Sequence, residues 1–453
     1  MSELRDAIYK KYFVPTKRKA KDCVGVEFEL PIVNMNKEAV DFNLIHNLAV
    51  DFIEHFSFSK SLFDDNNNIY SAINVVNNDN LSFDCSYNTL EFSFGATSNL
   101  NDVYARFKEY YVYVQDYLKP YNHTLTGMGI NPYRHYNNNE PIPNERYRML
   151  FNHLNSYERY EGAYHDYPEF GLFSAANQVQ LDVEENNIVD VINTFYLLEP
   201  LKSLLFANSI LDDMLCSRDY LWKHSLHGFN LKNVDGYDEP FECIEDVLDY
   251  IEGMSMYCIM REGKYVNFKP VPLTTYFASK SIEGEYYEDG EYKHITIVPR
   301  IEDLEYLRSF KFEDLTFRGT VEFRSVCEQP VNEIMASSAL HAGLMKKIYE
   351  LDELLKNDTV IYNHGYNVRE LRELFNKGEI PDYIDKDKLK DLLHKIIDLA
   401  AIGLSERGYG EEHFIKPLYR RADNLLSPAK EILDGLKEGK EIEYYINKFA
   451  ILE

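Results

Sequence analysis

Four short stretches of the chain alternate apolar residues with carboxylates or amides, and this alternation constrains the fold more than any other feature. The stretches are 24–30, 89–94, 178–183 and 320–324. Successive side chains on a β-strand point to opposite faces, so each stretch has one apolar face and one polar face. The polar faces carry Glu27, Glu29, Glu91, Gln178, Gln180, Asp182, Glu322 and Arg324. If the four strands share one sheet, its polar face gathers several carboxylates with little positive charge.

Each stretch alone fits a half-buried antiparallel strand with a solvated face, and alternation with a period of two is common. The four stretches together favour a metal site, because clustered carboxylates repel one another unless a cation lies between them. Glutamate oxygens, together with water and phosphate oxygens, are the hard ligands that suit Mg²⁺. The pattern therefore predicts a sheet whose polar face binds metal.

The charge balance limits the classes of partner. The chain has 453 residues, with 48 basic against 75 acidic side chains and a formal charge of −27. Such a charge argues against nucleic acid or an anionic membrane surface as the main partner. ATP stays possible as a substrate, because divalent cations bridge like charges. The six cysteines show no C-x-x-C spacing, and no signal peptide or long apolar run is present. We therefore expect a soluble, cytoplasmic protein.

Strand signals dominate residues 1–330, and helical periodicity dominates residues 331–453. Strands followed by helices predict an α+β fold, and we expect one domain over 1–453 in which helices cover a mainly antiparallel sheet. Residues 64–80 are expected to form a loop or a poorly ordered hairpin, and 284–293 a mobile segment that covers the site. Helices are expected over 101–119, 187–207, 242–252, 333–356, 368–375, 387–407 and 428–437.

Several motifs, taken in chain order, carry a resemblance to a known family. Val24-Gly-Val-Glu-Phe-Glu29 resembles a G-x-E-x-E strand, and Leu90-Glu-Phe-Ser-Phe-Gly95 resembles an F-E-L-S-G segment. Gln178-Val-Gln-Leu-Asp182 is similar to Q-V-N-L-D, and Glu322-Phe-Arg324 to an E-F-R-G strand. With Gly403-Leu-Ser-Glu-Arg-Gly-Tyr409 and further pieces, the chain resembles glutamate–cysteine ligases of the class found in plants and alphaproteobacteria, within the glutamine-synthetase-like superfamily.

The resemblance implies a fold, an activity and a set of site residues. The fold would be a curved, mainly antiparallel sheet that forms an active-site cradle. The activity would be the ATP- and Mg²⁺-dependent joining of the glutamate γ-carboxylate to the amine of cysteine through a γ-glutamyl phosphate, the first step of glutathione synthesis. The protein would be a monomer or a homodimer with small-molecule substrates.

Site residues carried over from the family fall into three groups. The resemblance implies that Arg324 holds nucleotide phosphate oxygens and that Arg218 binds a substrate carboxylate, both as catalytic residues. Tyr257 and Trp222 would line the amino-acid pocket, and Gln180 would contact the nucleotide. The Mg²⁺ ligands would be Glu27, Glu29, Glu91 and Glu322.

Two departures from the family pattern fall where substrates would be recognised. Residues 84–89 replace the glycine-rich E-P-G-G-Q, and Lys223-His-Ser-Leu226 replaces a stretch in which threonine and aspartates are usual. The chain is therefore also compatible with a related ligase that joins glutamate to a different amino acid or amine, or with a catalytically silent relative.

Simpler interpretations of single residues also stay open. Arg324 with Glu322 fits a plain ion pair on a strand, and Arg218 fits a cap on a surface turn. Tyr257 fits an ordinary hairpin tyrosine. The sequence favours a polar surface pair for His224 and His227.

Overall fold

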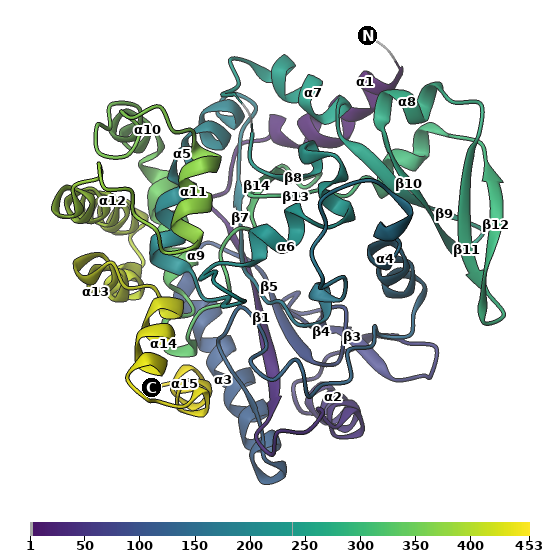
Figure 1. The fold of residues 1–453 in the computed structure, drawn as a ribbon, viewed down its shortest axis with the longest axis horizontal. Helices are drawn as coiled ribbons and strands as arrows, with labels where there is room; N and C mark the ends of the chain where they lie inside the picture. The colour runs from purple at the N-terminus through teal and green to yellow at the C-terminus, as the bar shows by residue number, and fades with distance from the viewer. Residues whose placement is uncertain (1–2, 238) are drawn as a thin grey trace.

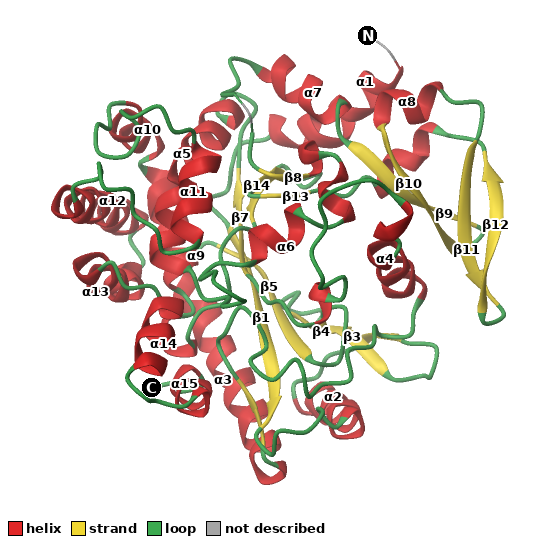
Figure 2. Cartoon of the chain, in the orientation of Figure 1, coloured by secondary structure: helices red, strands yellow, loops and turns green. Residues whose placement is uncertain are grey.

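The computed structural model describes residues 3–237 and 239–453, and its centre is a nine-stranded sheet (Figures 1 and 2). Along the sheet the strand order is β14-β15-β7-β1-β5-β4-β3-β2, and β6 pairs with β1. Every pairing within it is antiparallel, which confirms the predicted α+β class with a mainly antiparallel sheet. The strands are β1 (Val24–Asn34), β2 (Lys60–Phe63), β3 (Ile69–Ile73), β4 (Asn80–Phe83), β5 (Thr89–Thr97), β6 (His123–Leu125), β7 (Asn177–Asp182), β14 (Glu313–Leu315) and β15 (Thr320–Phe323).

The four alternating stretches become four adjacent strands, β15, β7, β1 and β5. Their apolar side chains form one buried face on which Phe28 lies opposite Phe92, and Val26 opposite Val179. All four of these side chains are at most 1% exposed. Burial of this face is the main driving force that fixes the register, because a slip of one residue would turn the carboxylates into the core.

Helices cover the apolar face of the sheet. α3 (Leu100–Leu118) contacts β5, and α9 (Ala336–Lys346) contacts β1 and β7. α3 begins where the side chain of Asn99 accepts a hydrogen bond from the backbone amide of Asn101, and it buries an apolar stripe at helical spacing. The other helices before residue 330 are α1 (Glu3–Ile8), α2 (Phe42–His55), α4 (Glu145–Asn155), α5 (Ile188–Phe206), α6 (Arg218–Lys223), α7 (Ile244–Glu252) and α8 (Leu273–Ala278).

A second, four-stranded antiparallel sheet lies on the far side of α4 from the main sheet, at the right of Figure 1. Its order is β12-β11-β10-β9, and α4 contacts β10 and β11. Its strands are β9 (Ser255–Arg261), β10 (Lys264–Pro272), β11 (Ile282–Glu288) and β12 (Glu291–Ile297). A short parallel pair, β8 (Val234–Asp235) with β13 (Phe310–Lys311), forms a separate two-stranded sheet.

Helices α9 to α15 follow the last strand and lie together at the left of Figure 1. Most of them match the helices expected from the sequence. Their bounds, after α9, are α10 (Ile348–Lys356), α11 (Val368–Asn376), α12 (Lys386–Arg407), α13 (Lys416–Asn424), α14 (Pro428–Lys437) and α15 (Ile442–Phe449).

Of the two alternatives for residues 64–80, the hairpin is correct and the loop is wrong, since β3 pairs with β2 on one side and with β4 on the other. Residues 284–293 are not a loop. They lie in the regular hairpin of β11 and β12, in which Ile282 pairs with Ile297 and Glu288 with Glu291. In both segments the acidic and asparagine-rich composition suggested irregular structure, but cross-strand pairing decides the conformation. The hairpin is therefore an edge of the second sheet.

Candidate active site

The polar faces of β15, β7, β1 and β5 form a continuous row of carboxylates and amides, which we call the cradle. Its members are directly paired across the strands: Glu29 lies opposite Glu91, Gln178 opposite Glu27, and Gln180 opposite Glu322. The sheet therefore brings together all four glutamates predicted to bind metal, although they come from three strands far apart in the chain.

Two amides lie between the carboxylates of the cradle. Nε2 of Gln180 donates hydrogen bonds to Glu27 Oε1, at 3.2 Å, and to Glu322 Oε1, at 3.0 Å. Nε2 of Gln178 donates to Glu29 Oε1 at 2.7 Å, and the backbone amide of Ala176 donates to Glu29 Oε2 at 2.6 Å. These donors offset the repulsion only in part, because an amide carries no net charge.

Three glutamates of the cradle hold their protons more tightly than free carboxylates. Burial, together with the charges of Glu322 and Glu91, raises the pKa of Glu27 to about 8. Burial and the nearby Asp84 raise the pKa of Glu91 to about 7, and burial with the same aspartate also raises that of Glu29. The cradle is thus short of positive charge, and a bound cation would lower all three values.

The carboxylate oxygens of the four glutamates are suitable ligands for a divalent cation, but the four side chains lie in a row and do not surround one point. Within the described parts of the chain, no three His, Cys, Asp or Glu side chains are grouped so that they could hold a metal ion. Each glutamate instead has its own partner, such as Ser93, whose hydroxyl donates to Glu91 at 2.6 Å. The donor set is rich in hard oxygen, as Mg²⁺ requires, and Mg²⁺ commonly takes only one or two carboxylates.

Two further carboxylates, which the alternating stretches did not include, belong to the cradle. Asp314 of β14 lies directly opposite Glu322 and accepts a hydrogen bond from the hydroxyl of Ser309. Asp84 follows β4 and acts electrostatically on Glu29 and Glu91. Local sequence gave little signal for Asp314, because β14 is only Glu313–Leu315, too short for a clear alternation.

Arg324 lies at one end of the cradle, half-buried at the end of β15. Its Nη1 donates to Glu322 Oε2 at 2.8 Å, so the ion pair that the sequence allowed does form. An arginine on a strand end beside carboxylates keeps donors free for a further oxyanion, because a guanidinium carries five N–H groups.

Arg218 is buried at the start of α6, so the alternative of a cap on a surface turn is wrong. Its Nη1 donates to the backbone oxygens of Arg324, at 3.3 Å, and Val326, at 3.1 Å. No carboxylate among the described residues lies within ion-pair distance of it, and its Nε has no hydrogen-bond partner there. A buried guanidinium without a carboxylate partner is suited to bind a substrate carboxylate.

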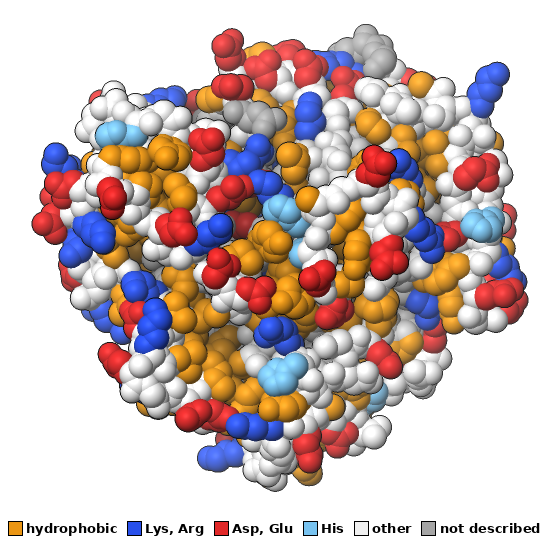
Figure 3. Space-filling model, viewed as in Figure 1, with side chains coloured by type: hydrophobic (Ala, Val, Ile, Leu, Met, Phe, Trp, Pro, Cys, Tyr) orange, Lys and Arg blue, Asp and Glu red, His pale blue; other side chains and the backbone are white. Residues whose placement is uncertain are grey.

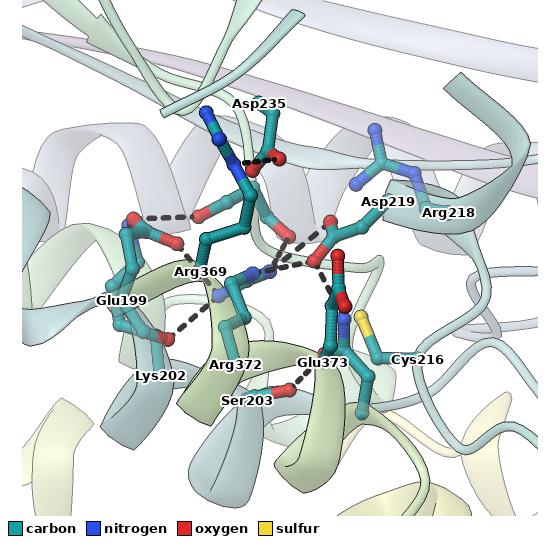
Figure 4. A network of polar contacts seen from close by, with 12 residues as sticks. Glu199, Lys202, Ser203, Cys216, Arg218, Asp219, Asp235, Arg369, Arg372 and Glu373 are labelled. Carbon is teal, nitrogen blue, oxygen red and sulfur yellow. Dashed lines mark hydrogen bonds and ion pairs between the residues drawn. The ribbon is translucent and has the colours of Figure 1, made fainter. Parts of the chain in front are cut away.

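A buried ionic network, the anchor network, holds the helix that carries Arg218 (Figure 4). Its centre is Arg372 of α11, which donates to Glu199 Oε2 at 2.6 Å and to Asp219 Oδ1 at 3.2 Å. Lys202 pairs with Glu199, and Nδ2 of Asn376 donates to Asp219 at 2.8 Å. Burial alone would raise the pKa of Glu199, but Lys202 and Arg372 hold it at about 2.

An aromatic wall lies beside the arginines. The ring of Trp222 stacks on Phe310 at 4.3 Å, and His227 lies 5.1 Å from Trp222 and 5.2 Å from Tyr257. Tyr257 in turn stacks on His153 at 4.2 Å. The expected surface position of His227 is wrong, because its side chain is only 4% exposed. Burial also lowers the pKa of both histidines, so they are neutral at physiological pH.

A pocket of about 230 Å³, which we call the cationic pocket, adjoins the cradle at Glu322. One part of its wall is apolar or aromatic and includes Tyr12, Ile251 and Met254. Its charged side chains are Lys11, Arg146, Arg308, Lys311, Arg318 and Arg324, against Glu305, Asp314 and Glu322. Basic residues outnumber acidic ones in this pocket, although the chain has a formal charge of −27. On the face drawn in Figure 3 the two signs are interspersed.

Sequence comparison finds plant enzymes among the curated relatives. The chain is 23% identical over 328 residues to the chloroplastic glutamate–cysteine ligase of Brassica juncea, a match covering 68% of this chain and 57% of the relative. It is 24% identical over 277 residues to the enzyme of Nicotiana tabacum, covering 58% of this chain and 49% of the relative. The chain thus spans about half the length of the curated relatives it matches. No protein-family model matches it.

Structural comparison agrees with the sequence relatives. The crystal structure of glutamate–cysteine ligase from Francisella tularensis in complex with AMP superposes with a TM-score of 0.52 at 12% identity. The superposition covers 97% of this chain and 88% of that one. No helix in the described parts of the chain is long and apolar enough to cross a membrane. In sequence the chain is therefore similar to plant glutamate–cysteine ligases, and it shares its fold with a bacterial one.

Proposed function

We propose that the protein is an ATP- and Mg²⁺-dependent carboxylate–amine ligase that forms γ-glutamylcysteine. The observation that carries the proposal is the cradle of carboxylates directly beside a pocket rich in positive charge. Such a juxtaposition suits phosphoryl transfer to a carboxylate, in which two anions must approach each other. The similarity to glutamate–cysteine ligases supports the same reaction class.

The reaction that we propose has two steps. An oxygen of the glutamate γ-carboxylate attacks the terminal phosphorus of ATP, and ADP leaves. The amine nitrogen of the acceptor then attacks the acyl carbon, phosphate leaves with the bonding electrons, and the nitrogen loses a proton. Mg²⁺ would supply charge neutralisation for the phosphates when bound, and Glu27, Glu29, Glu91 and Glu322 are the residues that would hold it.

Each remaining site residue has a role in this scheme. Arg324 would bind oxygens of the transferring phosphate, with Gln180 orienting the neighbouring nucleotide and carboxylates. Arg218 would bind a carboxylate of the amino-acid substrate, and Trp222 and Tyr257 would form the wall of the acceptor pocket. The cationic pocket would take the nucleotide, with its apolar part towards the base and its arginines towards the phosphates.

One observation favours a different acceptor as a second candidate. His153 and His227 are neutral and buried beside Tyr257, and their Nε2 atoms have no hydrogen-bond partner among the described residues. Residues 223–226 also depart from the family pattern. An acceptor with a polar side chain other than a thiol would satisfy such atoms.

Purified protein incubated with glutamate, Mg²⁺, ATP and single amino acids tests both candidates. We expect release of ADP and phosphate that depends on glutamate and on one acceptor, and mass spectrometry of the product from a mixed amino-acid pool identifies that acceptor. Cysteine as the sole acceptor would remove the second candidate, and no phosphate release with any acceptor would remove both. The plant relatives are named as chloroplastic, and a cytoplasmic location of this protein stays a prediction.

A further inference from the structure

One lysine of the cationic pocket has a chemical environment that the roles above do not explain. Lys311 is the last residue of β13 and lines both the cationic pocket and a smaller cavity that reaches Arg218 and Trp222. Its side chain is only 2% exposed. It therefore lies where the nucleotide end of the site meets the amino-acid end.

The ammonium group of Lys311 has aromatic neighbours in place of the usual oxygen partners. Nζ lies 3.8 Å from the centre of the Tyr250 ring and 4.4 Å from that of Tyr237, and both rings also line the cationic pocket. No hydrogen-bond acceptor among the described residues reaches Nζ. Two ring faces stabilise a cation by charge attraction but leave at least one of the three N–H donors unused.

An unpaired buried ammonium is costly, and a protein keeps one only where something compensates for it. By contrast, Lys11 lines the same pocket and donates a hydrogen bond to the backbone oxygen of Leu304 at 2.7 Å. Arg324 likewise has Glu322. Among these three basic groups of the pocket, Lys311 is the one whose polar atoms lack an oxygen partner.

We propose that Lys311 is the inner end of an anion subsite, where its ammonium group binds a phosphoryl oxygen of a nucleotide. The inference rests on the proposed function for the identity of the ligand, but its geometry stands on the pocket itself. A phosphoryl oxygen would supply the missing acceptor, and a charge-assisted hydrogen bond to it would be among the stronger contacts of the complex.

Binding at this subsite would also take up a proton. Burial lowers the pKa of Lys311 to about 7, so the amine is largely neutral above neutral pH, and an anion beside it would return the pKa towards its usual range. Four charged groups act most strongly on Nζ, and a bound phosphate would have the same effect as the three acidic ones. They are Asp314, Asp235 and Glu313, which favour the charged form, and Arg369, which opposes it.

The test is calorimetric titration with a non-hydrolysable ATP analogue and Mg²⁺, carried out in buffers of different ionisation enthalpy. At about pH 7.5 we expect proton uptake on binding to be larger in the wild-type protein than in the K311M variant, by about half a proton or more per molecule bound. We expect K311M to bind the analogue at least about tenfold more weakly, as befits the loss of a charged hydrogen bond. AMP and tripolyphosphate, titrated separately, show which phosphate reaches the lysine.

Two further variants complete the test. K311R keeps a charge that does not titrate, so we expect it to bind the analogue without the extra proton uptake. K232M is the matched control, because Lys232 also lies over the Tyr250 ring, at 5.1 Å, but does not line the pocket. It should behave as wild type.

Unchanged affinity and proton uptake in K311M, or a wild-type protein that binds neither the analogue nor tripolyphosphate, would overturn the proposal. If K311M does not fold, K311R decides in its place, since it must bind the analogue without the extra proton uptake of the wild-type protein. Triphosphate binding that depends on Lys311 without any ligase activity would refute the proposed function and leave the subsite standing. Normal activity in a K311M protein that binds as wild type does would refute the subsite alone.

Discussion

The cradle and the anchor network are two groups of buried charges with opposite electrostatic character. In the network, Glu199 and Asp219 are matched by Lys202 and Arg372, and the pKa of Glu199 falls to about 2. In the cradle the carboxylates face mainly amides and one another, and the pKa of Glu27 rises to about 8. Glu199 and Asp219 thus have basic partners within the chain, whereas the cradle lacks positive charge that a ligand would have to supply. The contrast separates residues that support the site from residues that act in it.

The largest effect is expected from breaking the network. R372M leaves Glu199 and Asp219 without their arginine partner, and we expect the free energy of unfolding to fall by about 3–5 kcal/mol. Chemical denaturation measures this free energy. The matched control is K356M, which removes an exposed pair with Asp352 and should change the value by less than about 1 kcal/mol. Equal stability of the two variants would show that the network does not hold the fold.

Removing a cradle carboxylate should lower activity and leave stability intact. We expect E27Q to lose about a hundredfold or more in kcat, because a metal ligand or its electrostatic equivalent is gone. Its stability in the absence of metal should be equal to or above wild type, since the substitution removes repulsion from Glu322 and Glu91. E291Q, at an exposed position of β12, serves as the control in both assays. Loss of stability together with retained activity would place Glu27 with the structural charges.

A smaller and more selective effect is expected at Arg218. R218K keeps the charge but loses the planar fork, so we expect KM for the amino-acid substrate to rise by about tenfold with a lesser change in kcat. Steady-state kinetics with each substrate varied in turn measures this. A change confined to the KM for ATP would contradict the carboxylate role and assign the residue to the nucleotide.

A more gradual effect is the pH dependence of stability that the cradle imposes. The pKa values of Glu27 and Glu91 are raised in the folded protein, so the folded state binds more protons than the unfolded state between their ordinary pKa and about 8. The associated stability is full below the unfolded pKa and is lost as pH rises through the folded values, by about 1.4 kcal/mol for each unit by which a pKa is raised.

Thermal unfolding at several pH values, with and without Mg²⁺, measures this term. We expect Mg²⁺ to raise Tm most at the alkaline end, because a cation favours the charged carboxylates. E27Q should flatten both the pH dependence and the response to Mg²⁺, while E291Q should leave them as in wild type. A wild-type Tm that does not respond to Mg²⁺ at any pH would contradict a metal site in the cradle.

Periodicity predicted much of the fold correctly. The alternation at 24–30 and 320–324 predicted both the strands and which side chains would share a face, since side-chain direction in a strand follows directly from sequence position. Local composition was a poorer guide at 284–293, because strand pairing with β10 and within the hairpin determines that segment. His227 was misplaced for a similar reason: its burial depends on Trp222, Tyr257 and Phe310, which no local pattern connects.

The sequence by itself determined that apolar and acidic side chains would separate onto opposite faces of strands, because that depends only on the two-residue period of an extended backbone. The tertiary structure alone decided that β15, β7, β1 and β5 are neighbours, that Asp314 lies opposite Glu322, and that Lys311 is buried without an oxygen partner. The physical reason is that electrostatic environment depends on distance in space, and strands separated by hundreds of residues set these distances only when the sheet forms.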